Sequence, residues 1–294
     1  MKTSNTTTNQ RLPSLDVIVP CYNEARDIIP CVDALLAQQD DINQIILIDN
    51  ASTDGTLDLM KQLMKKANHK KIIVIEEKER GLIAARNTGF AAANADIFAR
   101  IDGDTRVEPG WALAIRHYYA VHSTIGFAIG TSTHYDMPES PFFAWVNHLF
   151  TYTANEVLAH STLAYGANMS ITRAAWQRAS KDFCNRTGIM EDQDVQYHIR
   201  THGYETGYID DAHAVVSGRR ARTSPLKFWR YNRQWWYTYA IHGQMGAARR
   251  IRVAAWVGNI LQLLGWFVLQ FHDPDTNRFS LLYVMRRQED RPIT

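Results

Sequence analysis

The alternation of two patterns between residues 15 and 104 limits the fold of this chain more than any other feature. Short apolar runs of strand length alternate with stretches in which apolar residues recur at helical spacing. Each helical stretch offers one apolar stripe that can pack on a sheet. The runs are Leu15–Val19, Gln44–Ile48, Lys71–Ile75 and Asp96–Ile101, and the helical stretches are Ala25–Gln38, Thr56–Ala67 and Leu82–Ala93. This order predicts an α/β fold with a parallel sheet.

A polar or glycine-containing segment follows each predicted strand. Because ligands bind outside the carboxyl ends of parallel strands, these segments are predicted to meet at one site. They are Pro20–Glu24, Asp49–Gly55, Glu76–Gly81 and Asp102–Thr105. Three of the four are rich in acids, Asn or Gly, which favours a functional interpretation.

The last of these segments contains two aspartates, Asp102 and Asp104, separated only by Gly103. An isolated Asp-Gly-Asp tripeptide is more often a solvated turn. Two oxygen donors at the end of a buried strand also suit Mg²⁺ or Mn²⁺, which usually bind substrate phosphates as well. The neighbouring acidic segments favour the metal site.

Composition narrows the class of protein. The 294 residues allow one large domain, or one domain with an appendage, and 46% hydrophobic with 21% charged residues is typical of a folded, mostly soluble protein. A net charge of +2 gives no general reason to expect a nucleic-acid partner. Cys21, Cys31 and Cys184 show no zinc or CxxC spacing, and such a sparse, odd count fits a reducing compartment.

The regular alternation ends after Gly126. Beyond it we expect strands at Ile125–Thr133 and Gly166–Thr172, a helix at Arg173–Ala179, and an aromatic-rich helix or loop at Phe142–Leu158.

Glu191 and Asp192 then start a helix that Val195, Ile199 and the closing Gly203 define. The helix dipole alone favours acids at this position, so a structural and a functional interpretation of the pair both remain open.

From Leu226 onward, aromatic and basic residues are interleaved, and Arg249–Arg252 precedes an apolar run at Val253–Phe271. The run is long enough to span a bilayer, but it contains Asn259 and two glutamines. Three interpretations stay open: a helix lying in the membrane interface, a spanning helix, and a core or oligomer contact.

Four segments in this order resemble glycosyltransferase family 2 of the GT-A type, a group that includes bacterial inverting enzymes. They are Val17–Glu24, Ile46–Thr56, Arg80–Gly89 and the Asp102-Gly103-Asp104 tripeptide, which matches the DxD motif. The resemblance runs from about Leu15 to about Arg222. It implies a GT-A fold, which is a Rossmann-like, mostly parallel sheet flanked by helices.

The resemblance also implies roles on the donor side. Asp49 would contact the nucleobase, Asp104 would ligate Mn²⁺ or Mg²⁺, and Asp102 would face the ribose or the metal. Arg86 would hold Asp102 or the diphosphate, unless it forms only a surface salt bridge. His213 is a candidate metal ligand, although a lone histidine in a strand is more often structural. The other donor-binding residues are Pro20, Tyr22, Asn23 and Glu24 in the nucleoside loop and Gly103 in the DxD motif.

On the acceptor side, Met190–Asp194 resembles the family's Glu-Asp motif, in which the aspartate is the general base. The resemblance assigns Asp192 as base and Glu191 as its neighbour, which contacts the acceptor or fixes the loop. Asp194 is the rival base, but a helix start would turn it away. The remaining candidates for acceptor or phosphate contacts are Gly166 and Asn168, in a strand before the acceptor site, and Arg219 and Arg220, which otherwise form a solvated basic loop.

These features predict a domain arrangement: a flexible tail at 1–14, a nucleotide-sugar half at 15–125, an acceptor half at 126–222 and a helical extension at 223–294. The family's processive synthases carry a QxxRW motif, from which Arg230–Trp235 departs, so processive synthesis is not expected.

The predicted function is metal-dependent, inverting sugar transfer from a nucleoside-diphosphate sugar to a glycan or lipid-linked acceptor. We expect the protein in the cytoplasm, peripheral at the inner membrane face, because its polar start resembles no signal peptide. Two alternatives are a catalytically silent GT-A-like scaffold and a phosphoacceptor receiver domain. The receiver domain is disfavoured because it would be far shorter and would not explain Glu191 and Asp192.

Overall fold

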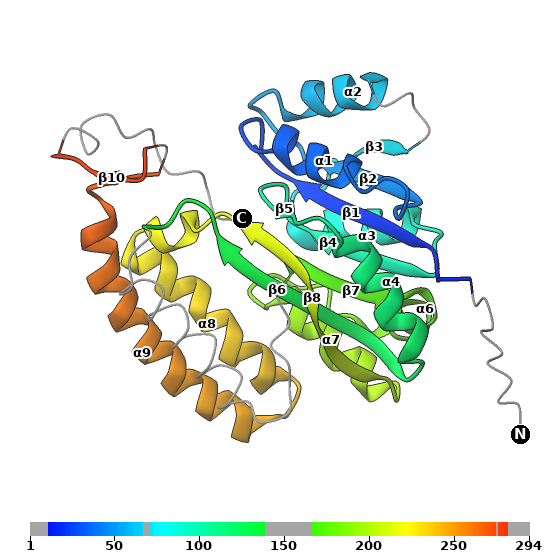
Figure 1. Ribbon diagram of the computed structural model, residues 1–294. Helices are drawn as coiled ribbons and strands as arrows, with labels where there is room; N and C mark the ends of the chain where they lie inside the picture. The colour runs from blue at the N-terminus through cyan, green and yellow to red at the C-terminus, as the bar shows by residue number, and fades with distance from the viewer. Residues whose placement is uncertain (1–10, 67–70, 139–165, 275, 282–294) are drawn as a thin grey trace, which may run out of the picture.

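A computed structural model describes residues 11–66, 71–138, 166–274 and 276–281 of the chain. Its main feature is an eight-stranded sheet in the order β3-β2-β1-β4-β7-β6-β8-β5 (Figure 1). The four strands predicted from the alternation form one parallel half of this sheet, with β1 between β2 and β4. They are β1 (Leu15–Cys21), β2 (Gln44–Asp49), β3 (Ile72–Glu76) and β4 (Ile97–Ile101).

The other half of the sheet is mixed. Strand β7 runs antiparallel to both β4 and β6, whereas β8 is parallel to β6 and carries the short antiparallel β5. These strands are β5 (Arg106–Val107), β6 (Ile125–His134), β7 (Asn168–Thr172) and β8 (Glu205–Val216). The predicted α/β class with a mostly parallel sheet is confirmed.

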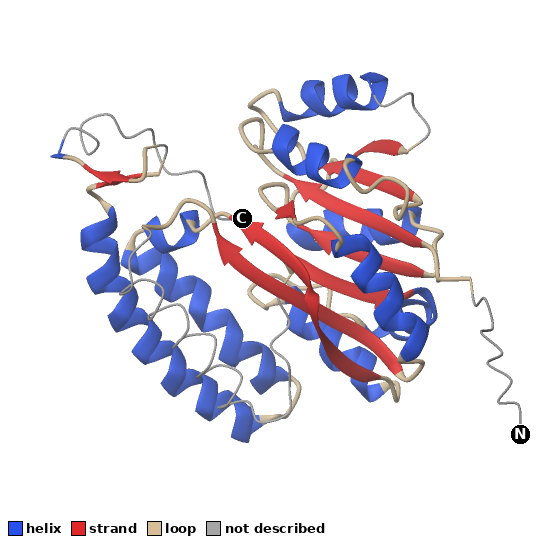
Figure 2. Cartoon of the chain, in the orientation of Figure 1, coloured by secondary structure: helices blue, strands red, loops and turns tan. Residues whose placement is uncertain are grey.

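Helices cover both faces of the sheet, as Figure 2 shows in blue. One buried apolar cluster joins the sheet to α1, α2 and α4, and a second joins it to α3, α6 and α7. These helices are α1 (Ile28–Leu36), α2 (Thr56–Lys66), α3 (Leu82–Ala92), α4 (Trp111–Val121), α6 (Arg173–Ala179) and α7 (Glu191–Thr201). Two 3-10 turns, η1 (Ser180–Asp182) and η2 (Arg219–Arg222), join neighbouring elements. The strand ends of β1, β2 and β4 and the start of α7 are thus fixed by a continuous core.

The predicted elements agree with the observed ones apart from their ends. Helix α1 begins at Ile28 rather than at Ala25, because the N–H groups of Asp27 and Ile28 both donate to the carbonyl of Glu24 in a preceding turn. The segment Phe142–Leu158 lies outside the described residues.

The C-terminal part forms a hairpin of two long helices, α8 (Pro225–Ile241) and α9 (Met245–Leu269), which lie side by side next to the α/β part (Figure 1). A small sheet of β9 (His272–Asp273) and β10 (Arg278–Phe279) follows. Helix α9 is the one helix among the described residues that is both long enough and apolar enough to cross a membrane. Only 17% of its most apolar 18-residue stretch is buried.

Candidate active site

The loops after β1 and β2 are joined into one unit. The N–H of Asn23 donates to Ser52 Oγ at 3.0 Å, and Asn23 Oδ1 accepts from the Thr53 N–H at 2.8 Å. Asn23 and Ala51 adopt positive φ values of 56° and 58°, which are uncommon for residues other than glycine. Strained backbone of this kind persists only where the surroundings enforce it, and it concentrates at ligand-binding sites.

Asp49 ends β2 beside this unit, where the sequence predicts a nucleobase contact. Its side chain is buried, and Oδ2 accepts from the Ser52 N–H at 3.2 Å. Oδ1 is also buried, and it has no hydrogen-bond partner among the residues that the structure describes. An unsatisfied buried acceptor costs roughly 1–3 kcal/mol, so a ligand N–H that reaches Oδ1 would be stabilised.

The DxD tripeptide follows β4 and packs against the end of β1. A Cβ atom on Gly103 would lie 2.8 Å from Cys21 Sγ and 2.9 Å from Glu24 Cγ, so the position has no room for a side chain. Asp102 remains about a third exposed, whereas Asp104 is buried. The two carboxylates therefore differ in environment although they are two residues apart.

Arg219 of η2 holds the buried side of this site. Its guanidinium contacts Asp104 Oδ2 at 3.0 Å and both carboxylate oxygens of Glu24. Burial raises the pKa of Asp104 to about 7, against the opposing effect of Arg219, and the charges of Asp102 and Glu24 raise it further. The sequence predicts that Arg219 brings positive charge to the diphosphate or to a lipid phosphate, and the structure places it beside Asp104 and Glu24.

The carboxylates of Glu24, Asp102 and Asp104 also fit a divalent metal. All three supply hard oxygen ligands, and their mutual repulsion would be relieved by a cation. Arg219 already contacts two of them, so a metal ion would have to share or displace part of that contact.

Arg100 connects the donor side to the acceptor side, and the sequence analysis missed this role. It lies in β4 with only 2% of its side chain exposed, and Nη2 contacts Asp102 Oδ1 at 3.0 Å while Nη1 pairs with the carboxylate of Glu191. The signal was an arginine within an otherwise apolar strand, directly before the DxD motif. A buried arginine needs acidic partners, and here they come from both halves of the site.

Asp192 is held at the start of α7 by backbone groups. Oδ2 accepts from the Gly166 N–H and Oδ1 from the Gln193 N–H, both at 2.8 Å. Burial raises the pKa of Asp192 to about 7, and the adjacent Glu191 adds to this effect while Arg100 opposes it. A carboxylate with a pKa near neutrality can accept a proton during catalysis, so this environment suits a general base.

Gly166, a predicted acceptor-side residue, positions the Asp192 carboxylate. Besides donating to Asp192, it packs so closely on Arg100 that a Cβ would lie 2.7 Å from Nη1. Asp194, the rival base, binds the N–H of Cys184 at 2.8 Å instead.

Arg86 makes a different contact from the predicted one. It does not pair with Asp102; its guanidinium donates to the Glu191 carbonyl at 3.1 Å and lies 3.9 Å from that residue's carboxylate. Arg100 takes the expected place because it extends from β4, which ends at Ile101, directly before Asp102. Arg86 is fully buried rather than a surface salt bridge, and it fixes the start of α7.

Asn168 lies inside the sheet instead of at the acceptor. Its amide donates to the carbonyls of Thr131 and Ala212 at 2.8 and 2.9 Å and accepts from Trp111 Nε1 at 2.9 Å. These three bonds join β6, β7, β8 and α4, so Asn168 has a structural role.

The last two predicted residues also have protein partners. His213 pairs through its ring nitrogens with the hydroxyls of Thr131 and Thr133, at 2.7 and 3.1 Å, which matches the structural alternative for a lone histidine. Arg220 stacks on the ring of Tyr231 in α8, 4.2 Å from its centroid, and also donates to its hydroxyl.

Comparison with protein families identifies the class. The model of glycosyl transferase family 2 matches residues 16–178, which is more than half of the chain. The chain therefore belongs to glycosyl transferase family 2, and the family predicted from the sequence is confirmed.

Curated relatives match over shorter segments. Glycosyltransferase AglE of Haloferax volcanii is 35% identical over 102 residues, which is 34% of this chain and 33% of that protein. Glycosyltransferase GlyG of Streptococcus pneumoniae is 26% identical over 132 residues, which is 45% of this chain and 43% of that protein. The chain thus aligns with less than half of the length of each of these relatives.

Solved structures share the fold along most of the chain. The mannosyltransferase PcManGT of Pyrobaculum calidifontis, in complex with GDP-Man and Mn²⁺, has a TM-score of 0.62 at 20% identity and covers 94% of this chain and 79% of that one. The TarS 1-349 structure from S. aureus in complex with UDP has a TM-score of 0.51 at 15% identity and covers 88% and 72%. These similarities confirm the predicted GT-A fold.

Proposed function

We propose that this chain is a metal-dependent, inverting glycosyltransferase that moves a sugar from a nucleoside-diphosphate sugar to a hydroxyl acceptor. The observation that carries the proposal is the arginine link between the two halves of the site. Arg100 contacts the DxD residue Asp102 and also Glu191, which precedes the buried base Asp192. The buried guanidinium of Arg100 therefore links Asp102, on the donor side, to the segment that carries the proposed base Asp192.

On the donor side, the joined loops after β1 and β2 hold the nucleoside, with Asp49 Oδ1 free to accept from the base. A divalent metal on Asp102 and Asp104 would neutralise charge that develops on the leaving diphosphate. Arg219 adds a fixed positive charge beside Asp104, which favours the same anionic group.

On the acceptor side, Asp192 takes the proton of the attacking hydroxyl. The acceptor oxygen forms a bond to the anomeric carbon while the bond from that carbon to the diphosphate oxygen breaks, and the bonding electrons leave with the diphosphate. A single displacement of this kind inverts the anomeric configuration. The two backbone N–H donors keep the carboxylate of Asp192 oriented, so little reorganisation is needed.

The α8–α9 hairpin supports a place at a membrane surface. An exposed apolar stripe runs along α9 and consists of Val253, Trp256, Val257, Ile260, Leu263, Leu264 and Phe267. Two polar residues in the middle of this helix face the protein: Gln262 donates to the carbonyls of Ala221 and Thr223, and Asn259 accepts from Asn232. This one-sided pattern, with Arg249, Arg250 and Arg252 at the start of α9, favours a helix lying in an anionic interface over a spanning one.

The membrane proposal is tested by sedimentation with vesicles that contain phosphatidylserine. The double variant Trp256→Glu/Phe267→Glu should lose binding, whereas Val121→Glu, an exposed apolar position on α4, should keep it. Unchanged sedimentation of the double variant would contradict the proposal, and a shift from dimer to monomer would assign the stripe to a second copy of the chain.

The proposed reaction is tested by screening nucleotide sugars with and without Mn²⁺. GDP-mannose and UDP-sugars are the first donors to try, because the structural neighbours are complexes with GDP-Man and UDP. We expect Mn²⁺-dependent binding and slow hydrolysis of at least one donor. Absence of both for every donor would favour the scaffold alternative.

A further inference from the structure

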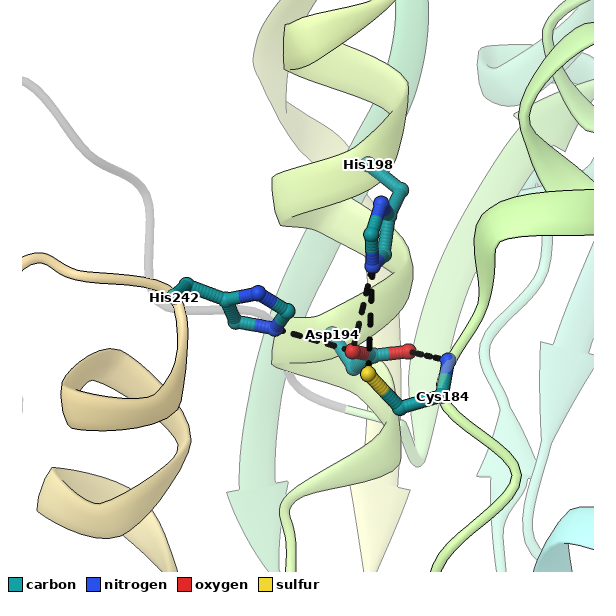
Figure 3. Close-up of side chains that lie close together, drawn as sticks. All are labelled: Cys184, Asp194, His198 and His242. Atoms are coloured by element: carbon teal, nitrogen blue, oxygen red, sulfur yellow. Dashed lines mark hydrogen bonds and ion pairs between the residues drawn. The ribbon is translucent and has the colours of Figure 1, made fainter.

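Four side chains outside the proposed catalytic site bring metal-binding atoms together: Cys184, Asp194, His198 and His242 (Figure 3). Cys184 follows η1, Asp194 and His198 lie on α7, and His242 caps the end of α8. Their ligand atoms all lie within 4.8 Å of one another. The fold thus gathers a thiol, a carboxylate and two imidazoles from three separate segments.

The spacing of these atoms is close to that of a tetrahedral metal site. Asp194 Oδ1 lies 2.9 Å from His242 Nε2 and 3.5 Å from His198 Nε2, and Cys184 Sγ lies 4.0 Å from His198 Nε2. Zinc–nitrogen and zinc–sulfur bonds of about 2.0–2.3 Å, at tetrahedral angles, place neighbouring ligand atoms roughly 3.3–3.6 Å apart. The remaining pairs lie within 4.8 Å, so side-chain shifts on the order of an ångström would bring all four atoms to one ion.

The surroundings fix these side chains before any ion binds. Asp194 is fully buried, and its Oδ2 accepts from the Cys184 N–H at 2.8 Å, which leaves Oδ1 directed at both histidines. The ring of Tyr197 stacks on His242, with centroids 3.9 Å apart and planes 20° apart.

We propose that Cys184, Asp194, His198 and His242 form a structural Zn²⁺ site that fastens α7 to the end of α8. Thiolate and imidazole ligands favour zinc over Mg²⁺ and Mn²⁺, which prefer oxygen ligands alone. On binding, the ion displaces the thiol proton of Cys184, and this proton is released to solvent. The set is closed, with four protein ligands, which is typical of structural rather than catalytic zinc.

The site lies where it can stabilise the acceptor side. Asp194 is two residues beyond Asp192, on the same helix, and the Met190 N–H donates to Thr238 Oγ1 of α8 at 2.8 Å. A hollow of about 250 Å³ lies between α7 and α8, and His242 is one of the residues that line it. Zinc would therefore strengthen a junction that the hydrogen bonds already form.

The test uses the full chain without a histidine tag, stripped of metal and then titrated with Zn²⁺ and Co²⁺. We expect one zinc per chain and, with Co²⁺, a thiolate-to-cobalt charge-transfer band. Cys184→Ser should lose the band, and His242→Gln should weaken zinc binding by more than the roughly 10–100-fold typical of lost outer-shell partners. His202→Gln is the matched control, because His202 ends the same helix and pairs with Asp182 instead.

His242→Gln is expected to fold, because the glutamine side-chain amide can still donate a hydrogen bond to Asp194. A loss of zinc binding in this variant would therefore not result from misfolding. Zinc should raise the melting temperature of the wild type and of His202→Gln but not of His242→Gln. The proposal is overturned if the wild type gives no charge-transfer band, or if Cys184→Ser and His242→Gln bind zinc as the wild type does. Repeating the titration in Asp104→Ala separates this site from the donor carboxylates. Neither readout depends on sugar transfer.

Discussion

The donor and acceptor sides of the site hold their key carboxylates in different ways. Asp49, Asp102 and Asp104 follow directly from strand ends of the parallel half, and each lies where its strand delivers it. Asp192 instead begins a helix and depends on Gly166 and Arg100, which are distant in sequence. The comparison shows that one side is built by local order along the chain and the other by long-range contacts.

The two sides also differ in electrostatics. Asp104 and Asp192 are both buried, and burial raises the pKa of each to about 7. Asp104 contacts a cation, Arg219, directly. The hydrogen bonds of Asp192 within the described part of the chain come from backbone N–H groups, and Arg100 lies beside its neighbour Glu191. The first arrangement suits anchoring of charge, and the second suits transfer of a proton.

The largest effect is expected from Asp104→Ala, which removes the buried carboxylate of the DxD motif. Metal-dependent donor turnover should be abolished, since the metal loses its ligand and Arg219 pairs only with Glu24. Isothermal titration of donor with and without Mn²⁺ measures the loss. Asp211→Asn, an exposed acid on β8, is the control. Normal Mn²⁺-dependent turnover in Asp104→Ala would contradict the proposal that Asp104 holds the metal and serves the donor side of the site.

Asp192→Asn should separate chemistry from donor binding. The amide keeps the shape of the side chain but cannot accept a proton, so transfer should fall by about 10²–10⁴-fold. Donor affinity, measured by the same titration, should stay within about twofold of the wild type, because no donor residue is changed. Transfer at the normal rate would show that the base assignment is wrong.

Arg100→Met tests the link between the two sides. The change leaves Glu191 buried without its close partner, and breaking a buried ion pair costs roughly 3–5 kcal/mol of unfolding free energy. Urea denaturation measures this loss, and donor and acceptor kinetics should both decline. Arg116→Met, which loses a more exposed pair with Asp41, should cost far less. Equal losses for the two variants would argue against a special role for Arg100.

The smallest effect is expected in the pH dependence of the rate, which should distinguish Asp104 from Asp192, the two carboxyl groups whose pKa is raised. The base acts only when deprotonated, so transfer should rise about tenfold per pH unit below about 7 and level off above it. Saturating Mn²⁺ holds Asp104 deprotonated, so the rise in transfer rate below pH 7 would be due to Asp192. Stability has the opposite sign: because the folded pKa of Asp192 is raised, the fold binds its proton more tightly, and its contribution is lost as pH rises toward 7. A flat rate between pH 5 and 8 would contradict the assignment.

Local pattern predicted the donor half of the fold well. The strands ending at Cys21, Asp49 and Ile101 were visible as apolar runs, because a strand buried on both faces must be apolar along its length. The polar residues after those runs could then be placed at one sheet edge without knowledge of side-chain contacts.

Contacts between distant segments decided the rest. Arg100 rather than Arg86 pairs with Asp102, because Arg100 lies in β4 just before Asp102, whereas Arg86 contacts Glu191 at the start of α7. Asn168 bridges strands within the sheet, because Thr131, Ala212 and Trp111 meet its amide only after β6, β8 and α4 pack around β7. Spacing also showed no zinc pattern around Cys184, because His242 reaches the cluster only through the docking of α8.

The sequence by itself determined the family and the parallel half of the sheet, and it led to the prediction of which carboxylates form the DxD and Glu-Asp pairs. Those features depend on periodicity and on short motifs, which act within one element or its flanking loop. Only the tertiary structure decided which cation serves which carboxylate, how Asp192 acquires a pKa near neutrality, and that Cys184 meets Asp194. Burial and pairing of charges depend on groups that are far apart in sequence and close together only after folding.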